Sequence, residues 1–316
     1  MRIVFCGTSE FAVPSLRRLA KDPGFTIEAV VTQPDRPRGR GRKLGASPVK
    51  DAALEAGLHV YQPEKMKSES AAGFFRRTAP DAVIVIAYGQ LIPASMLGEP
   101  RLGWINLHAS LLPKYRGAAP INWAIVNGES TTGITTMRIE EGLDTGPILQ
   151  QIEMHIGPDE TAPELSARMA ETGAPLVIET LKRLERGEIT PVPQDERQAT
   201  HAPLLKKEHG RLDWMLNARA IYNRIRGLAP WPGAYTTFRG RLCHVWGAPA
   251  AEAAAATEIP GTIIAASRQL YVVCGAGTCL RLEAAQVEGR TRVSAQDFAN
   301  GMRLAANERF GAGPAK

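Results

Sequence analysis

Residues 81–88 form the stretch DAVIVIAY, an apolar run that is not interrupted by any charged residue after Asp81. A strand with one face in solvent alternates apolar and polar residues, and this run shows no such alternation. Continuous apolar runs of this length are typical of parallel strands that are covered on both faces. The stretch therefore predicts an inner strand of an α/β sheet.

Strand-like and helix-like segments alternate on both sides of this run. Further strands are expected at 2–6, 26–32, 104–107, 133–138 and 148–155. Helical spacing or capping residues predict helices at 11–21 and 47–57. Residues 164–186 are also expected to be helical, as two helices or one kinked helix, because Gly173 and Pro175 interrupt the pattern. Repeated strand–helix–strand units predict a Rossmann-like, doubly wound and mostly parallel sheet.

The C-terminal third has a different pattern. A segment rich in proline and polar residues at 187–203 is followed by an expected helix at 214–226. Short β-like segments separated by glycine then follow at 234–238, 242–246, 261–265, 270–273 and 278–282, before a capped helix at 294–303. The pattern predicts a small, open, OB-like β-barrel. We expect a catalytic domain at 1–189, a linker at 190–205 and the barrel at 206–316.

Composition places the chain among globular proteins, with 316 residues, 44% hydrophobic and 22% charged. No apolar run approaches the roughly 18–20 residues of a membrane-spanning helix, and the N-terminus lacks the features of a signal peptide. The four cysteines form no C-x-x-C pair and have no zinc-type spacing with histidine. We therefore expect a cytoplasmic protein with reduced thiols and no metal.

The positive charge is concentrated in the C-terminal third. Residues 206–316 hold 15 Lys and Arg against 8 Asp and Glu, whereas residues 1–205 hold 23 against 24. This asymmetry favours a polyanionic partner, although a solvated basic surface would show the same composition.

Asn106 and His108 stand one residue apart at the end of the expected strand 104–107. In extended chain they point the same way, and the carboxyl end of a parallel strand is where such sheets bind ligands. The amide can donate to an oxygen that gains charge, and the imidazole can move a proton near neutral pH. Asp144, between Gly142 and Gly146 in GLDTGPIL (142–149), is the best candidate for a carboxylate partner. Taken alone, an Asp beside Gly more often forms a turn.

The motifs NLHASLLPKYRGAAPINWAI (106–125) and GITTMRIEEGLDTGPIL (133–149) resemble the folate-dependent formyltransferase family. Four other stretches resemble the branch of that family that acts on methionyl-tRNA: RIVFCGTSEFAVPSL (2–16), TQPDRPRGRGRKLGASPVK (32–50), AYGQLIP (87–93) and RIRGLAPWPGAYTTF (224–238). The resemblance runs from residue 2 to about residue 303.

The resemblance implies transfer of the formyl group of 10-formyltetrahydrofolate to the α-amine of initiator methionyl-tRNA. Asn106 would donate a hydrogen bond to the oxyanion with help from His108, which would also relay the amine proton. Asp144 would either orient and stabilise His108 or take the proton itself, and the sequence leaves this choice open. The resemblance also implies a folate site lined by Ser110, Leu111, Leu112 and Pro113, with Ile86 and Tyr88 as weaker candidates. No metal is implied.

The stretch QPDRPRGRGRKLG at 33–45 is expected to be an irregular, basic loop that contacts tRNA. Its candidate residues are Arg36, Arg38, Arg40, Arg42 and Lys43, and the resemblance singles out Arg40. A solvated loop is the alternative. In the C-terminal domain Arg224 and Arg226 are weaker candidates for phosphate contacts. For Arg116 we expect an ion pair with a nearby carboxylate, with a role in the site as the alternative. The expected protein is a monomer without a membrane or an obligate protein partner.

Three rival functions fit fewer of these features. A formyltransferase for a sugar-nucleotide amine would not need the RPRGRGRK run. A non-enzymatic nucleic-acid binder would leave Asn106-x-His108 and the LDTG motif unexplained. A dinucleotide-dependent dehydrogenase would need a G-x-G-x-x-G turn, which the segment at Gly7-Thr8 lacks.

Overall fold

The computed structural model describes residues 1–38, 43–250, 258–266, 268–306 and 308–311. The chain divides into two compact units. The first comprises Met1–Pro120, Thr131–His155 and Glu164–Pro203, and the second Ile121–Ser130, Ile156–Pro163 and Leu204–Lys316. The second unit therefore takes two short pieces of chain from between strands and helices of the first.

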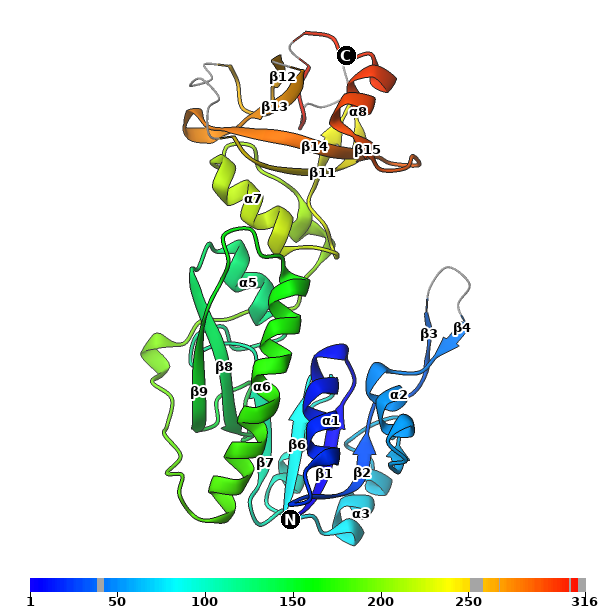
Figure 1. Ribbon diagram of the computed structural model, residues 1–316, viewed down its shortest axis with the longest axis vertical. Coiled ribbons are helices and arrows are strands. Elements are labelled where there is room, and N and C mark those ends of the chain that lie inside the picture. Colours follow the sequence, from blue (N-terminus) through cyan, green and yellow to red (C-terminus); the bar gives the residue numbers. More distant parts are fainter. Residues whose placement is uncertain (39–42, 251–257, 267, 307, 312–316) are drawn as a thin grey trace. The chain divides into compact units, whose positions relative to one another are not determined.

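A seven-stranded sheet forms the centre of the first unit, in the order β5-β2-β1-β6-β7-β8-β9 (Figure 1). Its strands are β1 (Arg2–Gly7), β2 (Thr26–Val31), β5 (Val60–Tyr61), β6 (Ala82–Ile86), β7 (Trp104–His108), β8 (Thr131–Arg138) and β9 (Ile148–His155). Neighbours from β5 to β7 are parallel, and β8 is antiparallel to β7 and β9. All five residues of β6 are buried, as the apolar run predicts. The Rossmann-like, mostly parallel sheet is confirmed.

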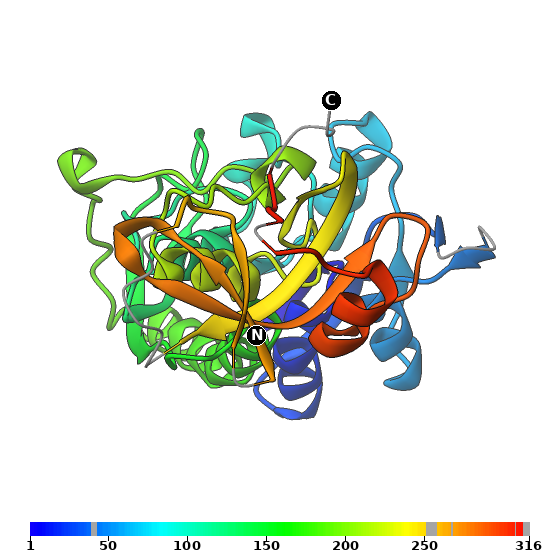
Figure 2. The same cartoon turned by 90° about the horizontal axis from the view of Figure 1, so that it is seen from above.

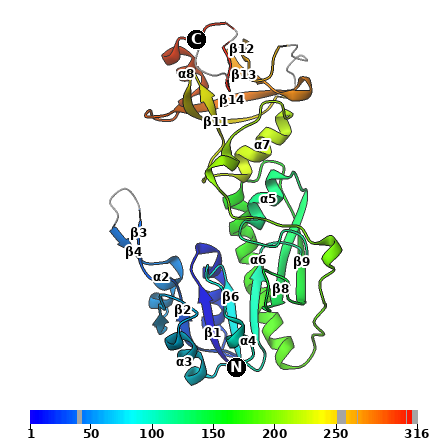
Figure 3. The same ribbon diagram turned by 180° about the vertical axis from the view of Figure 1, so that it is seen from behind.

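Helices cover both faces of this sheet. They are α1 (Val13–Lys21), α2 (Pro48–Glu55), α3 (Glu69–Thr78), α4 (Ala94–Leu97) and α6 (Ala162–Glu185). On one face Phe75 of α3 and Met96 of α4 join a core cluster with Val83 and Val85 of β6. Figure 1 shows α1 and α6 in front of the sheet, and the view from behind in Figure 3 shows β1 and β6 in front.

Of the two alternatives expected for 164–186, two separate helices is wrong, because α6 is one helix of 24 residues with Pro175 inside it. Gly173 does not end the helix, and its role is in packing. A Cβ atom at Gly173 would lie 2.6 Å from Cδ2 of Leu107, so glycine allows α6 to approach β7 closely.

Two short strands occur where an irregular loop was expected. β3 (Arg36–Arg38) and β4 (Lys43–Gly45) form an antiparallel hairpin in which Arg36 pairs with Gly45 and Arg38 with Lys43. The expectation of a wholly irregular segment at 33–45 is therefore wrong at both ends. Pro37 is compatible with this hairpin, because an edge strand can lack one backbone donor. Residues 39–42 lie outside the described part.

The second unit is built on an antiparallel sheet in the order β10-β11-β14-β13-β12, with β15 paired to β14. The strands are β10 (Tyr235–Phe238), β11 (Arg241–Pro249), β12 (Ile263–Ala266), β13 (Gln269–Val273), β14 (Cys279–Val287) and β15 (Val293–Ser294). Its helices are α7 (Ala218–Gly227) and α8 (Ala295–Met302), and most of α5 (Pro120–Val126) also belongs to this unit. α8 lies against β14 (Figure 2). The ring of Phe298 in α8 is buried and contacts the rings of Phe238 and Phe310.

Candidate functional site

Asn106 and His108 lie where β7 ends, and Asn106 is paired in register with Val85 near the end of β6. Leu107, between them, points to α6, where it meets Gly173. Because side chains alternate along a strand, Asn106 and His108 point to the opposite face. Both polar residues are therefore presented at the carboxyl end of the parallel strands, the edge at which open α/β sheets bind ligands.

The imidazole of His108 is fixed on one side by the backbone. Its Nε2 lies 2.9 Å from the carbonyl oxygen of Tyr115, and the residue is only 6% exposed. A carbonyl oxygen can only accept, so Nε2 carries the proton in this hydrogen bond. Nδ1 is then the nitrogen that faces the carboxylate of Asp144, with 3.6 Å between Nδ1 and Oδ2.

Asp144 is held in a loop whose backbone is unusual. Its φ is +54°, in the left-handed region that few residues other than glycine adopt. The carboxylate oxygen Oδ2 accepts a hydrogen bond of 2.8 Å from the backbone nitrogen of Gly117. At Gly146 a Cβ atom would lie 1.9 Å from the carbonyl oxygen of Arg138, so only glycine fits there. The loop thus carries the carboxylate to His108 and ties it to the segment after β7.

Asn106 has unused hydrogen-bonding capacity. Its side-chain oxygen Oδ1 is buried and has no hydrogen-bond partner, and its amide makes no side-chain hydrogen bond to any residue within the described ranges. Buried polar atoms in folded proteins are nearly always paired, so an unpaired amide at a ligand-binding edge indicates a group that engages a substrate. The three residues predicted from sequence are therefore brought together, with Asn106 and His108 on one strand end and Asp144 beside His108.

The segment Ser110–Pro113 folds into a turn held by internal hydrogen bonds. The hydroxyl of Ser110 donates to the carbonyl of Lys114 at 2.6 Å, and the hydroxyl of Thr135 donates to the carbonyl of Ser110 at 2.6 Å. Ser110 and Leu112 are buried at 0% and 3% exposure, so their side chains shape the turn. Leu111 and Pro113 are half-buried and remain the two side chains of this segment with free surface for a ligand.

Ile86 and Tyr88 belong to the core of the first unit, with 0% and 1% exposure. Burial raises the pKa of the Tyr88 hydroxyl, which has no hydrogen-bond partner. The carbonyl of Tyr88 accepts hydrogen bonds from the hydroxyl of Thr8 and the amide of Gln33. The expectation that these two side chains contribute to a folate site is not supported, because neither has surface to offer. Ala87 and Gly89 between and after them are exposed.

The basic residues predicted to contact tRNA are only partly described. Arg36 is exposed on β3, and the backbones of Arg38 and Lys43 pair across the hairpin. Arg40 and Arg42 lie outside the described residues.

Of the two arginines predicted in the C-terminal domain, Arg226 is corrected by the structure. It is 6% exposed, and its guanidinium donates to the carbonyls of Gly157 and Glu160 and to the side chain of Asn223. Burial also lowers its pKa. Arg226 therefore holds the second unit together instead of facing a phosphate. Arg224 is half-buried and donates one hydrogen bond of 3.2 Å to the carbonyl of His209.

Arg116 pairs with a carboxylate, as expected, and also with an amide. It is 3% exposed, and its guanidinium donates two hydrogen bonds to the carboxylate of Glu196 and two to the side-chain oxygen of Gln194. The amide nitrogen of Gln194 in turn donates to the carbonyls of Asp144 and Gly146. Sequence reasoning missed Gln194, because it lies 50 residues from Asp144 in a proline-rich segment without a recognisable motif.

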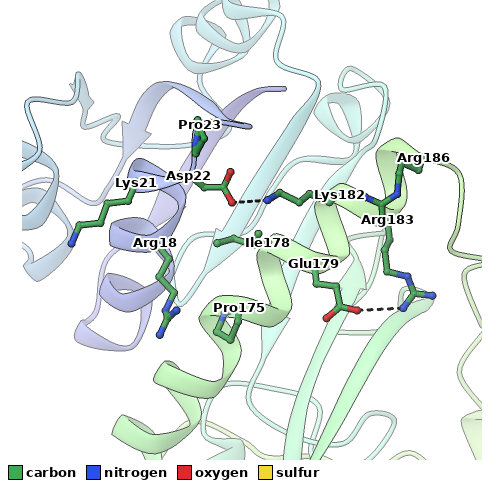
Figure 4. A pocket seen from close by; sticks show the side chains of 10 residues that line it. All are labelled: Arg18, Lys21, Asp22, Pro23, Pro175, Ile178, Glu179, Lys182, Arg183 and Arg186. Carbon is green, nitrogen blue, oxygen red and sulfur yellow. Dashed lines mark hydrogen bonds and ion pairs between the residues drawn. The ribbon is translucent and has the colours of Figure 1, made fainter.

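A groove of about 640 Å³ lies elsewhere in the first unit, between α1 and α6 (Figure 4). Its lining includes Arg18, Lys21, Lys182, Arg183 and Arg186. Four of these five cations already have a carboxylate within 4 Å. The pairs are Arg18–Glu171, Lys182–Asp22, Arg183–Glu179 and Arg186–Glu188. The groove contains none of the candidate site residues predicted from the sequence, and its paired charges leave little attraction for an anion.

Two absences concern the described part of the chain. Its His, Cys, Asp and Glu residues form no group of three that could hold a metal ion. None of its helices combines the length and the apolar character needed to cross a membrane.

Comparison with known families gives two matches along the chain. Residues 1–181 match the family "Formyl transferase", and residues 204–303 match "Formyl transferase, C-terminal domain". The methionyl-tRNA formyltransferase of Solibacter usitatus is 53% identical over 99% of this chain and 99% of its own length. That of Koribacter versatilis is 51% identical over 98% and 99%.

Solved structures share the fold at low sequence identity. WlaRD, a sugar 3N-formyl transferase solved in the presence of dTDP and 5-N-formyl-THF, is 17% identical with a TM-score of 0.65, covering 92% of this chain and 99% of its own. An N-formyltransferase from Helicobacter canadensis in complex with folinic acid and dTDP-3-aminofucose is 17% identical with a TM-score of 0.63, covering 89% and 98%.

Proposed function

The chain belongs to the formyl transferase family, and from this premise we propose that Asn106, His108 and Asp144 transfer a formyl group to methionyl-tRNA. The donor is 10-formyltetrahydrofolate, which supplies the formyl carbon and leaves as tetrahydrofolate. Identity of 53% over almost the whole of both chains supports methionyl-tRNA as the acceptor. The observation that carries the assignment of residues is the unpaired side chain of Asn106 beside the His108–Asp144 pair.

Asn106 acts on the oxygen of the formyl group. When the amine nitrogen of the methionyl group bonds to the formyl carbon, the electron pair of the C=O bond moves to oxygen. The side-chain NH₂ of Asn106, which has no partner in the described chain, can donate to that oxygen as its charge grows. Because the amide is already held at the end of β7, little reorganisation is needed when the charge appears.

His108 moves the proton. Its Nε2 is used by the carbonyl of Tyr115, so Nδ1 is the nitrogen that can accept the proton of the attacking amine. The carboxylate of Asp144, 3.6 Å away, stabilises the imidazolium that results. As the bond between the formyl carbon and the folate nitrogen breaks, the proton passes from Nδ1 to that nitrogen. Asp144 thus works by charge and orientation, which is one of the two roles that the sequence leaves open.

Substrate binding is assigned to the turn after β7, to the segment at 36–45 and to one arginine of the C-terminal domain. Leu111 and Pro113 would contact the folate, and Ser110 and Leu112 would keep their turn in shape. The hairpin at 36–45 and its arginines would contact tRNA phosphates, with Arg224 as a weaker contact in the C-terminal domain. We also propose a monomer that works in the cytoplasm, where its acceptor is made.

One assay tests the reaction and its acceptor together. Purified protein is given 10-formyltetrahydrofolate with methionyl-tRNA, free methionine or an amino-sugar nucleotide, and formylated product is measured. We expect rapid product only with methionyl-tRNA. Faster formylation of the amino sugar would reject the acceptor, and an Asp144→Ala variant with near wild-type turnover would reject the assignment of residues.

A further inference from the structure

Residues 192–202 pack along both loops of the site. Val192 exchanges two backbone hydrogen bonds with Ile148, just after the loop that carries Asp144. Further on, Thr200 and Ala202 hydrogen-bond to the two sides of Arg116, in the loop that follows His108. We call residues 192–202 the strap. It was expected to be part of a linker, but its ends are attached to the two loops that form the candidate active site.

Gln194 connects these two loops through its side chain. The amide nitrogen donates to the carbonyl of Asp144 at 2.8 Å and to that of Gly146 at 2.7 Å. The amide oxygen accepts from Nε and Nη2 of Arg116 at 3.0 and 2.8 Å. Both N–H groups and both lone pairs of one side chain are used, so Gln194 can hold the loops in only one relative position.

Arg116 is in turn fixed on its other side. Its guanidinium forms a two-pronged pair with the carboxylate of Glu196, at 2.9 and 2.8 Å, which is the geometry that arginine makes most specifically. The pair holds down the pKa of the Glu196 carboxyl, mainly through the hydrogen bond from Arg116. The strap thus contacts Arg116 at Gln194, at Glu196 and through the backbone near Thr200.

The hydrogen bonds from Gln194 help to hold the loop at Asp144, because its backbone is in a less common conformation. Its φ of +54° lies in the left-handed region, so a rotation toward the more common negative φ is open to it once its carbonyl is released. That rotation would move the carboxylate, which the geometry sets 3.6 Å from Nδ1 of His108 and 2.8 Å from the nitrogen of Gly117.

We infer that Gln194, held by Arg116, is a positioning residue for formyl transfer: its two hydrogen bonds to the Asp144 loop keep the Asp144 carboxylate beside His108. This inference rests on the proposed role of Asp144. The side chain of Gln194 hydrogen-bonds to Arg116 and to the carbonyls of Asp144 and Gly146, and not to Asn106 or His108. Its loss should therefore lower kcat and leave KM for either substrate nearly unchanged.

The test compares Gln194→Glu with a matched control. Glu keeps the size and the acceptor for Arg116, but it places an oxygen against the carbonyls of Asp144 and Gly146. Gln198→Glu makes the same change four residues along the strap, where the exposed side chain hydrogen-bonds to Asp195 and to no other described residue. We expect kcat to fall about 10- to 100-fold in Gln194→Glu, since displacements of about 1 Å can cost that much, and to stay within about 2-fold in Gln198→Glu.

A second variant and a double-mutant cycle separate positioning from general damage. Gln194→Asn keeps the amide but is one methylene too short to reach both loops, so it should show the same loss of kcat in a protein that a melting curve shows to be folded at the assay temperature. In an Asp144→Asn background, Gln194→Glu should have almost no further effect on kcat, because the group it positions has lost its charge.

Two results would overturn the inference: wild-type kcat in Gln194→Glu, or an equal fold-loss with and without the Asp144 carboxylate. If Asp144→Asn is inactive while Gln194→Glu is active, only the positioning role fails. If Asp144→Asn itself keeps wild-type turnover, the proposed function of the site fails, and the role of Gln194 fails with it.

Discussion

Nδ1 of His108 and Oδ2 of Asp144 lie 3.6 Å apart, and the same carboxylate oxygen is 2.8 Å from the backbone nitrogen of Gly117. The first distance is longer than a direct hydrogen bond, whereas the second is a good one. The main chain therefore orients the carboxylate, which is left to act on the imidazole mainly through its charge.

Replacing Asp144 with Asn should separate charge from shape. The amide oxygen of Asn can still accept from Gly117, so the loop should keep its place while the negative charge is lost. We expect kcat to fall at least about 100-fold, because proton transfer by His108 contributes at least that much and depends on this charge, with KM for folate little changed. Single-turnover formylation measures the effect, and a loss seen only in KM would show that Asp144 serves binding.

Asn106 can be tested with two substitutions of different charge. Asn106→Ala removes the donor and should lower kcat by about 100- to 1000-fold, as for other oxyanion donors. Asn106→Asp keeps the size but puts a carboxylate where negative charge develops, so it should be at least as slow as Asn106→Ala. Single-turnover formylation measures both variants. If Asn106→Asp were faster than Asn106→Ala, Asn106 would not lie next to the oxyanion.

The basic hairpin predicts a steep salt dependence of tRNA binding. Each phosphate contact contributes about 0.7–0.9 to the slope of log affinity against log salt. The experiment changes the five cations of this segment to Gln: Arg36, Arg38, Arg40, Arg42 and Lys43. The variant should bind methionyl-tRNA more weakly and show a flatter slope. Filter binding over a series of salt concentrations measures both quantities.

The groove between α1 and α6 provides the control for this experiment. It holds five cations as well, and changing Arg18, Lys21, Arg183 and Arg186 to Gln removes a similar charge from the same unit. We expect the salt slope to stay as in the wild type. Equal flattening in both variants would mean that tRNA affinity follows net charge alone.

The sequence was sufficient for the sheet and for the placement of Asn106 and His108 at one strand end, because both depend on local patterns. A wholly apolar run such as that of β6 has few structural alternatives, and a polar pair at the end of β7 is conspicuous by its position. The start of the helix expected at 47–57 is also confirmed, since α2 begins at Pro48 and Ser47 caps it by accepting a hydrogen bond from the nitrogen of Lys50.

The failures concern contacts that a local pattern cannot contain. Pro175 suggested a broken helix, but packing of α6 against β7 and β8 keeps it continuous. Arg226 appeared as one more surface cation, although it is buried among carbonyls of residues more than 60 positions away. The role of Gln194 likewise depends on Arg116 and Asp144, which the sequence separates by 78 and 50 residues.

Gly173→Ala should destabilise the first unit. The added methyl would lie 2.6 Å from Cδ2 of Leu107, so the buried Leu107 side chain, α6 or β7 must shift, at a cost of about 1–3 kcal/mol. Gly73→Ala in α3 is the matched control, because its methyl would meet only the guanidinium ends of Arg77 and Arg76 among the described residues, and alanine favours a helix by up to about 1 kcal/mol. Urea unfolding measures both, and equal stability of the two variants would contradict the close packing of α6 on β7.

The four cysteines should be unreactive in the folded protein. All four are buried free thiols, and burial raises the pKa of Cys243 to about 11 and that of Cys274 to about 12, with Cys6 and Cys279 also shifted upward. An aromatic disulfide reagent at pH 8 should therefore label none of them until the protein is unfolded, and then all four.

The same burial makes the stability of the protein depend on pH. The unfolded thiols ionise near pH 8.5–9 and the folded ones do not, so the unfolded state loses protons first. The free energy of unfolding should therefore fall as the pH rises above about 9. Rapid labelling of one thiol in native protein would contradict this burial. So would a free energy of unfolding that increases with pH beyond pH 9.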